Sequence, residues 1–426
     1  MLTIKEHIEQ KLVHSVHTSE RRSFRGCRRR WSWIFQEFYY PTVTPKPLEF
    51  GVAFHVGMEH LYDPDTWHDW NAALGIAKVK FKEKVKEQLV THEKFNGPID
   101  GDTKADYDER VKLGLGMLDY YAKTVMPKFD KGYKPVKVEV KFEVPVTGPD
   151  GEQLYCKCDI CKSRWRNSLQ GAEHHDAWQK QVQAPLALAL GSDFYLANIW
   201  QGLPVTFGGR LDMLAEDEDG RYWIFDWKSA AVLHTGDAQN ATDEFLVVED
   251  QITGYCAALR KLGLDIAGFV YAEIKKAVPG EPEPMTRRYK GRLYSTNKQA
   301  SYDPDLYAKI VEENDPEAFF AGEYDEYIEH LRLSVFHVRH QVHRNSDELD
   351  SADYNLWLEA SDMVDQGLRL YPSPGRFSCE SCAFLTPCVG KNRGEDYQYY
   401  LDSMFEKRTR HYYEDAPAST DKTGRG

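Results

Sequence analysis

The sequence contains no long hydrophobic run. Nowhere in its 426 residues do about eighteen apolar residues follow one another, the length a helix needs to cross a bilayer. The N-terminal segment MLTIKEHIEQKLVHSVHTSE also lacks the apolar stretch of a secretory signal. We therefore expect a cytoplasmic protein that does not bind membranes.

An excess of positive charge is also missing. The chain carries 54 Lys and Arg residues against 67 Asp and Glu residues, a formal net charge of -13. This balance argues against a protein that wraps a long duplex with its whole surface. Two local basic stretches, 21–30 and 275–292, are candidates for contacts with phosphates. An ordinary solvated face is the alternative for each, and some of the arginines could pack around a metal cluster instead.

Cysteine is scarce, with eight residues in the chain. In a large protein without a secretory signal, this favours metal ligands or free thiols over disulfides. One group has the spacing Cys156-x-Cys158-x2-Cys161 and, with His174 or His175, offers the ligands of a zinc site. Because this spacing is irregular for a zinc ribbon or finger, free thiols remain the alternative.

A second group of cysteines lies near the C-terminus, with the spacing Cys379-x2-Cys382-x5-Cys388. Three thiolates need a fourth ligand to complete either a tetrahedral zinc site or a four-iron cluster. Cys27, in the segment RGCRRRWSW, is the natural donor. The residues alone leave zinc, an iron–sulfur cluster and free thiols open.

Hydrophobic periodicity divides the chain into helical and extended segments. Apolar residues at every third or fourth position predict helices throughout the first part of the chain, at 24–38, 48–62, 66–93 and 105–128. Alternating patterns predict strands at 137–146, 204–217, 221–229 and 265–277. Further helices are expected at 246–263, 303–322 and 346–367, and the basic stretch 283–302 is expected to be a loop.

The predicted hairpin brings three charged residues together. Strand residues alternate between faces, so Asp226 and Lys228 point the same way while Trp227 points toward a core. A three-residue turn that ends on Gly220 fits the connection, with glycine at the left-handed position. In that register Asp212 lies directly opposite Asp226, with their Cβ atoms about 5 Å apart.

Two opposed carboxylates repel each other unless a cation lies between them. Carboxylate oxygens favour Mg²⁺ or Mn²⁺, and Lys228 beside such an ion could orient a water molecule or stabilise a phosphate. These parts suffice for phosphodiester hydrolysis. The alternative is an exposed hairpin with ordinary cross-strand charge pairs. The flanking Trp223, Ile224 and Phe225 favour a buried strand and thus the site.

The order of motifs resembles that of PD-(D/E)XK nucleases of the RecB type. GGRLD (208–212) and FDWKS (225–229) are similar to the G-x-x-D and D-x-K motifs of that family. Gln251 and Tyr255 supply its Q-x-x-x-Y motif on the next helix. His55, in GVAFH, matches its additional metal ligand, and His60 is a weaker candidate.

The cysteines extend this resemblance. The group Cys379, Cys382 and Cys388 with Cys27 is similar to that of RecB-like nucleases that carry an iron–sulfur cluster, among them AddB-type nuclease domains and CRISPR-associated exonucleases. The resemblance implies that these four cysteines hold a [4Fe-4S] cluster, which would tie the chain ends together and be structural.

The resemblance also implies a fold class, an activity and partners. We expect an α/β core like that of restriction endonucleases, in which helices flank a mixed sheet. The implied activity is Mg²⁺- or Mn²⁺-dependent cleavage of DNA, by an exonuclease acting on single- or double-stranded ends in recombination or phage DNA processing. A helicase or recombinase could be a partner. Gln251 and Tyr255 would position the strand, and Glu139 or Glu143 could also reach the site.

The regions of the chain follow from these assignments. We expect a helical region at 1–130 with Cys27 and His55, and a nuclease core at 131–280 with an insertion at about 147–203. A C-terminal helical region with the cysteine group follows at 281–407. The polar tail 408–426 is expected to be disordered.

Other interpretations stay open. Trp31, Tyr39 and Tyr40 could stack on the bases of a single strand, although packing in a core is the more ordinary role of aromatic residues. The chain could also be a DNA-binding module that does not cleave, or an interaction protein stabilised by zinc. The intact aspartate–lysine pattern argues against the module.

Overall fold

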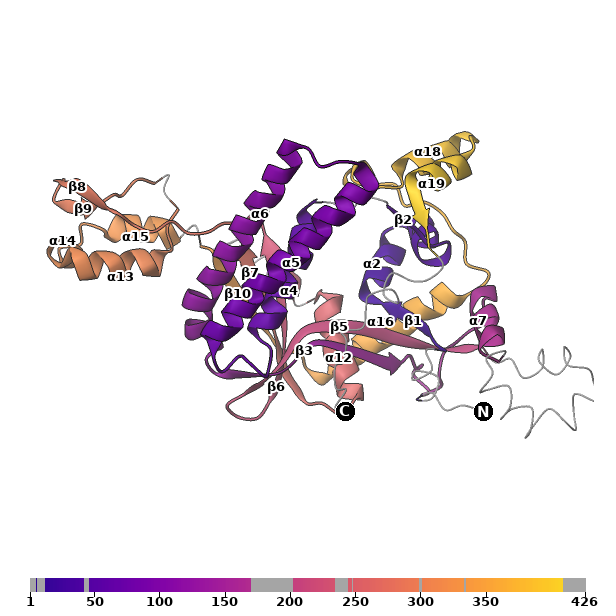
Figure 1. Cartoon of the computed structure of the whole chain (residues 1–426). Coiled ribbons are helices and arrows are strands. Elements are labelled where there is room, and N and C mark those ends of the chain that lie inside the picture. Colours follow the sequence, from indigo (N-terminus) through magenta and orange to yellow (C-terminus); the bar gives the residue numbers. More distant parts are fainter. Residues whose placement is uncertain are drawn as a thin grey trace, which may run out of the picture. The chain divides into compact units, whose positions relative to one another are not determined.

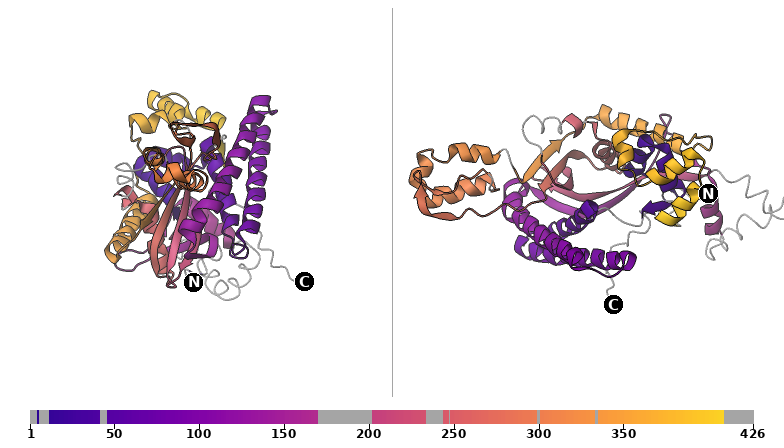
Figure 2. Two further views of the ribbon diagram at one scale, coloured as in Figure 1. Left: turned by 90° about the vertical axis from the view of Figure 1, so that its left-hand side faces the viewer. Right: turned by 90° about the horizontal axis from the view of Figure 1, so that it is seen from above.

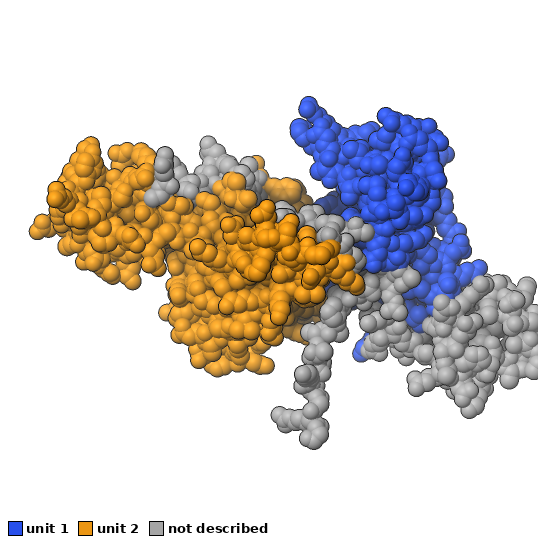
Figure 3. Space-filling model, turned by 45° about the horizontal axis from the view of Figure 1, so that its top comes forward, with its two compact units in different colours: residues 1–44, 143–209, 350–426 blue, residues 45–142, 210–349 orange. Residues whose placement is uncertain are grey.

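The computed structural model describes residues 5, 12–41, 46–169, 202–233, 244–246, 248–298, 301–332 and 335–408. The chain divides into two compact units, each assembled from segments that are far apart in the sequence (Figure 3). Unit 1 comprises residues 1–44, 143–209 and 350–426, and unit 2 comprises residues 45–142 and 210–349. His174, His175 and the predicted tail from residue 409 onward lie outside the described residues.

The central sheet of unit 2 is mixed (Figure 1). β6 (Tyr222–Ala230) pairs antiparallel with the second half of β5 (Leu203–Asp217) and parallel with β7 (Ile266–Lys275). β10 (His337–Val342) pairs antiparallel with β7, and β3 (Tyr133–Pro145) pairs with β5. The parallel step from β6 to β7 needs a crossover, and α12 (Asp250–Lys261) lies within it.

Long helices lie against this sheet in unit 2 (Figures 1 and 2). They are α4 (Lys46–Leu61), α5 (Trp70–Asn96), α6 (Gly101–Tyr120) and the π-helical segment η2 (Tyr121–Asp130). Asp69 and Asp100 cap α5 and α6, because their carboxylates accept hydrogen bonds from backbone N–H groups of the first turn. The prediction of an α/β fold with a mixed sheet flanked by helices is confirmed.

Aromatic side chains dominate the core between these helices and the sheet. Trp227 stacks on Tyr62 with ring centroids 5.0 Å apart, and its indole N–H donates to the Tyr121 hydroxyl at 3.2 Å. The prediction that Trp227 faces a core is therefore confirmed. Phe81 lies over Gly114, where an added Cβ would come within 2.0 Å of the ring. Glycine is thus required for the close approach of α5 and α6.

A second, smaller core in unit 2 lies under the basic stretch. It is formed by residues of β9 (Arg292–Tyr294), α13 (Pro304–Asn314), α14 (Pro316–Phe320) and α15 (Asp325–Arg332). β9 pairs with β8 (Pro284–Tyr289), so the prediction of a loop at 283–302 is wrong for residues 284–294. The turn uses Lys290 and Gly291 at φ 49° and 81°. The strands were missed because basic residues, not alternating apolar ones, fill them.

Unit 1 is built around the first half of β5. β1 (His14–His17) pairs with it in parallel and β4 (Tyr155–Cys156) in the antiparallel direction. A separate two-stranded sheet joins β2 (Tyr39–Pro41) to β11 (Phe405–Lys407). The helical elements are α2 (Thr18–Gly26), α3 (Arg28–Trp31), η1 (Ser32–Gln36), α7 (Asp159–Leu169), α16 (Ser346–Val364) from residue 350 onward, α17 (Arg376–Glu380), α18 (Leu385–Arg393) and α19 (Tyr397–Met404).

Two strands interrupt the N-terminal region that was predicted to be helical throughout. β1 and β2 have only four and three residues, too few to establish an alternating pattern. Their partners, β5 and β11, lie far away in the sequence. The prediction of an all-helical N-terminal region is wrong for this reason. None of the described helices is long and apolar enough to span a lipid bilayer.

Candidate active site

The hairpin of unit 2 has the predicted register. Met213 pairs with Phe225, so the preceding residue Asp212 lies opposite Asp226 on the partner strand. Gly220 closes the turn with φ 79°, in the left-handed region that glycine adopts without strain. The two carboxylates are therefore brought together by local chain geometry.

Asp212 is held by two donors. Its Oδ2 accepts a hydrogen bond from the backbone N–H of Trp227 at 2.9 Å and lies 3.2 Å from Nδ1 of His55, which α4 supplies. Burial alone would raise the pKa of Asp212, but His55, together with the Lys228 charge, lowers that pKa to about 2. Asp212 is therefore a carboxylate at neutral pH, and the pKa of His55 is raised in return because the effect of Asp212 exceeds that of burial.

Asp226 is almost completely buried, with 5% of its surface exposed. Lys228 Nζ lies 2.5 Å from its Oδ2, and Gln251 Nε2 donates to its Oδ1 at 3.3 Å. Burial, together with the neighbouring Asp212 carboxylate, raises the pKa of Asp226 despite the Lys228 charge. Burial would lower the pKa of Lys228, but the two aspartates raise it. The ammonium therefore stays charged at neutral pH.

A third carboxylate, Glu139 on β3, belongs to the same neighbourhood. Burial, and then the negative charges of Asp212 and Glu59, raise the pKa of Glu139 to about 7. The Arg210 guanidinium, whose Nε lies 2.8 Å from Oε2 of Glu139, partly offsets this rise. Glu139 also adopts φ 50°, a strained backbone conformation for glutamate. Of the two predicted glutamates, Glu139 lies beside Asp212, whereas Glu143 accepts a hydrogen bond from Thr206 at 2.5 Å in unit 1.

Sequence reasoning missed Glu59 and Arg210 as neighbours of the site. Glu59 follows His55 by four residues on α4, a spacing that places both on one face of a helix. That spacing could have identified it, whereas the weaker candidate His60 lies one position further round the helix. Arg210 precedes Asp212 by two residues on β5 and so shares its face. That alternation was the available signal for the arginine.

The two residues of the predicted helix motif have different surroundings. Gln251, in the first turn of α12, reaches the Asp226 carboxylate. Tyr255 is buried, with 8% of its surface exposed, and its ring packs edge-on against Phe142 with centroids 5.1 Å apart. Gln251 therefore joins the charged group, while the Tyr255 ring contributes to the core beside it.

The ligand chemistry of the hairpin group fits a hard divalent cation. Asp212, Asp226 and Glu139 provide carboxylate oxygens in one partly buried place, and His55 provides a nitrogen. Burial is the main cause of the raised pKa values of Asp226 and Glu139, and the negative charge of Asp212 adds to both. Oxygen ligands with surplus negative charge are what Mg²⁺ and Mn²⁺ require.

The four cysteines predicted to bind a cluster lie in one part of unit 1. Cys27 separates α2 from α3, Cys379 is in α17, and Cys382 and Cys388 pack against an aromatic core formed by Trp33, Tyr39, Phe384, Leu401 and Phe405. Burial raises the pKa of Cys382, and the nearby thiols of Cys27 and Cys379 raise it further. Arg29 donates to the Cys388 sulfur at 3.3 Å. All four cysteines are free thiols here.

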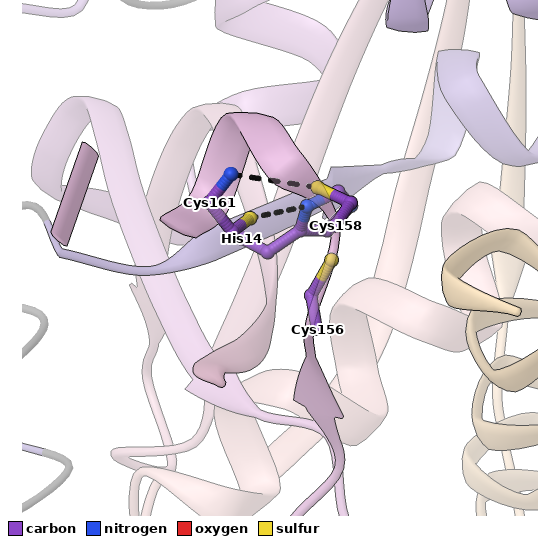
Figure 4. A group of neighbouring side chains, drawn as sticks. All are labelled: His14, Cys156, Cys158 and Cys161. Atoms are coloured by element: carbon purple, nitrogen blue, oxygen red, sulfur yellow. Dashed lines mark hydrogen bonds between the residues drawn. The ribbon is translucent and has the colours of Figure 1, made fainter. Parts of the chain in front are cut away.

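The second cysteine group has a neighbour that sequence reasoning missed. Cys156, Cys158 and Cys161 lie around His14 in unit 1 (Figure 4), and the ligand atoms of these four residues are all within 4.8 Å of one another. His174, the histidine predicted for this place, lies outside the described residues. The missed signal was the HSVH segment, which lay in a region predicted to be helical.

One arginine of the stretch 21–30 and two of the nearby aromatic residues serve packing. Arg21 is buried, and its Nε lies 2.7 Å from a Glu359 carboxylate oxygen of α16. Trp31 and Tyr39 are 2% and 1% exposed, so the interpretation that they stack on DNA bases is wrong, and core packing is confirmed. Tyr40 is partly buried. In the β8–β9 hairpin of unit 2, by contrast, the side chains from Arg287 to Lys290 are exposed.

Two comparisons with known proteins bear on these sites. The sequence profile of a family described as the PD-(D/E)XK nuclease superfamily matches residues 18–389. A search of curated proteins found no match. The profile spans residues of both units, including all the residues described above around Asp212 and Asp226.

Proposed function

The chain belongs to the PD-(D/E)XK nuclease superfamily, and we propose that it is a metal-dependent DNA nuclease with Asp212, Asp226 and Lys228 as its catalytic group. One observation carries this proposal: the hairpin register sets the two aspartates opposite each other, with the Lys228 ammonium 2.5 Å from Asp226. A surface hairpin would leave such charges in solvent, whereas Asp226 is buried with Lys228 and Gln251 as its partners, an arrangement that is common at functional sites.

The charged residues have distinct roles in this proposal. Asp212 and Asp226 would hold Mg²⁺ or Mn²⁺, with His55 assisting, and the ion would polarise the phosphoryl oxygen and lower the pKa of bound water. Lys228, kept charged by the aspartates, orients the attacking water and stabilises the negative charge of the phosphate. Gln251 fixes the orientation of the Asp226 carboxylate through its amide N–H.

DNA is the substrate that the family and the site favour, and its ends are the proposed point of attack. The resemblance of the D-x-K and Q-x-x-x-Y motifs to RecB-like and AddB-like enzymes supports exonuclease action in recombination or phage DNA processing, with a helicase or recombinase partner. The chain as a whole is acidic, with a net charge of -13, so phosphates need a local basic surface. The exposed basic hairpin β8–β9 would provide it.

An iron–sulfur cluster is the second part of the proposal. Cys27, Cys379, Cys382 and Cys388 would hold [4Fe-4S]. In support, Cys382 and Cys388 pack against one aromatic core, and the thiols of Cys27 and Cys379 lie close enough to raise the pKa of Cys382. Protein purified without oxygen should be brown and contain iron and acid-labile sulfide, both of which Cys382→Ser should lose. A protein with two zinc ions per chain and no iron would contradict the proposed iron–sulfur cluster but would leave the nuclease proposal unaffected.

Cleavage of labelled DNA tests the nuclease itself. Wild type should degrade linear DNA with Mg²⁺ or Mn²⁺, Lys228→Ala should be at least about a hundredfold slower, and the exposed control Lys309→Ala should match wild type. End-labelled linear DNA and closed circles, each single- and double-stranded, separate exonuclease from endonuclease action. If wild type and Lys228→Ala are equally inactive but both bind DNA, the chain is a silent DNA-binding module.

A further inference from the structure

We infer that His14, Cys156, Cys158 and Cys161 form a structural zinc site in unit 1. Within the described part of the chain, these residues are the one group of three or more His, Cys, Asp or Glu side chains whose ligand atoms all lie within 4.8 Å of one another. Three sulfurs and one imidazole nitrogen are a common ligand set for structural zinc. The site is independent of the hairpin carboxylates, which belong to unit 2.

The spacing of the ligand atoms suits one small ion. With Zn–S bonds of about 2.3 Å and a Zn–N bond of about 2.0–2.1 Å, neighbouring ligand atoms of a tetrahedron are about 3.6–3.8 Å apart. Nδ1 of His14 lies 3.4 Å from the Cys161 sulfur, and all the other pairs are within 4.8 Å. A four-iron cluster holds its thiolates farther apart, because the iron and sulfide atoms lie between them.

The four ligands come from three short elements that the first half of β5 brings together. His14 is the first residue of β1, which pairs with β5 from Val205 to Gly208. Cys156 ends β4 and pairs with Leu203. Cys158 directly precedes α7 and Cys161 lies in its first turn, where the Cys161 N–H points to the Cys158 sulfur at 3.5 Å. Figure 4 shows His14 and the three thiols converging on one point.

The burial of these ligands fits a site without an open position. Cys156 and Cys161 are each 1% exposed, and His14 and Cys158 are partly buried. Four protein ligands complete a tetrahedron, so no position is left for a substrate or a catalytic water. The ion would therefore stabilise the fold and take no part in chemistry.

The site would fasten the N-terminal strand to the body of unit 1. β1 has four residues, and its backbone pairing to β5 is short. Arg164 of α7 adds one further tie by donating to the Val13 carbonyl at 3.1 Å. A bond from His14 through zinc to Cys156 closes a loop of about 140 residues, and long loops gain the most from a permanent link.

Disulfide formation explains the group less well. All the described cysteines are free, and any one disulfide among three thiols would leave the third unpaired and His14 without a role. A single zinc ion uses all four residues. It also neutralises the negative charge of the thiolates that bind it.

Zinc content tests the site in the full chain, purified without added metal or chelator. Wild type should contain about one zinc per chain in addition to any iron. His14→Ala and Cys158→Ser should each bind zinc at least tenfold more weakly in competition with a chromogenic chelator. Cys256→Ala, which removes a buried thiol of α12 in unit 2, should retain the zinc of wild type.

X-ray absorption at the zinc edge decides the ligand set even if the variants fail to fold. Wild type should show three sulfurs at about 2.3 Å and one imidazole nitrogen at about 2.0–2.1 Å. A shell of four sulfurs would place the zinc at the other cysteine group and overturn the inference. Wild type with far less than one zinc, or full zinc retention by both folded variants, would also overturn it.

Discussion

Two of the candidate metal sites, the hairpin group of unit 2 and the His14 group of unit 1, use opposite ligand chemistry. Around the hairpin of unit 2 the donors are carboxylate oxygens with one imidazole, and the charged Lys228 lies among them. Around His14 in unit 1 the donors are three sulfurs and one nitrogen, which would complete a tetrahedron around one ion by themselves. Hard oxygen ligands suit an ion that exchanges water, whereas soft, closed sets hold an ion permanently. The comparison distinguishes a candidate catalytic metal site in unit 2 from a candidate structural metal site in unit 1.

The largest expected effect is on catalysis alone. Asp226→Asn keeps the size of the side chain but removes its charge, so it should slow DNA cleavage at least about 10³-fold, or about 4 kcal/mol. Zinc content should not change. The control Asp219→Asn alters an exposed carboxylate at the turn of the same hairpin and should keep wild-type activity. Loss of zinc in Asp226→Asn would break the separation between the two sites.

Removal of zinc should act on stability. A strong chelator should lower the unfolding free energy of wild type by about 3 kcal/mol, the effect expected when a ligand at about a hundredfold over its Kd is removed. Cys158→Ser should show the lowered stability before chelation and little further change. Urea unfolding followed by circular dichroism measures both. If the chelator destabilises the two proteins equally, the effect comes from another ion.

The pH dependence of stability tests the surplus negative charge of the hairpin site. Glu139 faces Arg210, Asp212, Glu59 and His55, and its pKa is raised to about 7, with burial as the main cause. Because the pKa of Glu139 is higher in the folded protein than in the unfolded chain, the folded state is favoured while Glu139 is protonated, below about pH 4.5. This contribution to the unfolding free energy is lost as the pH rises through 7.

Glu139→Gln removes this titration. In metal-free protein, the variant should therefore gain about 1–2 kcal/mol of unfolding free energy relative to wild type between pH 4.5 and pH 8. Urea unfolding at both pH values measures the difference. If the difference in unfolding free energy between variant and wild type does not change with pH, the pKa of Glu139 is not raised in the folded protein. Added Mg²⁺ should reduce the gain, because it stabilises the carboxylates.

The smallest expected effect concerns Gln251, which acts through Asp226. Without its amide N–H the carboxylate loses one hydrogen bond, and Gln251→Ala should lower kcat/KM about tenfold. The optimum metal concentration should rise as well, since the carboxylate is less well oriented. Gln341→Ala removes another glutamine that donates a side-chain hydrogen bond, to Tyr133, and serves as the control. Equal effects in both variants would assign Gln251 a structural role only.

The parts that the sequence predicted well depend on local rules. The relation of Asp212 to Asp226 follows from a short turn and the two-residue period of strands, and both hold in the structure. The helices α4 and α5 agree with apolar periodicity to within a few residues. His55 could be brought to Asp212 only by a resemblance, because no local rule links a helix to a strand more than a hundred residues away.

The parts that could not be predicted depend on long-range pairing. His14 joins the three cysteines because β1 pairs in parallel with β5, and nothing in HSVH specifies that partner. The β8–β9 hairpin was not predicted because the adjacent Arg287 and Arg288 break the alternation of apolar and polar residues that indicates a strand. The backbone conformation of Glu139 is likewise invisible in a sequence that alternates regularly through KVEVKFEV.

The stacking of Trp227 on Tyr62 limits which changes the hairpin can accept. A shift of β6 by one residue would drive the indole into the charged group and bury two charged side chains against aromatic rings. The middle residue of the D-W-K triplet therefore fixes the alignment of its neighbours from the core side of the strand. A protein engineer who transplants this hairpin into another scaffold must carry Tyr62 with it, or the triplet will lose its alignment.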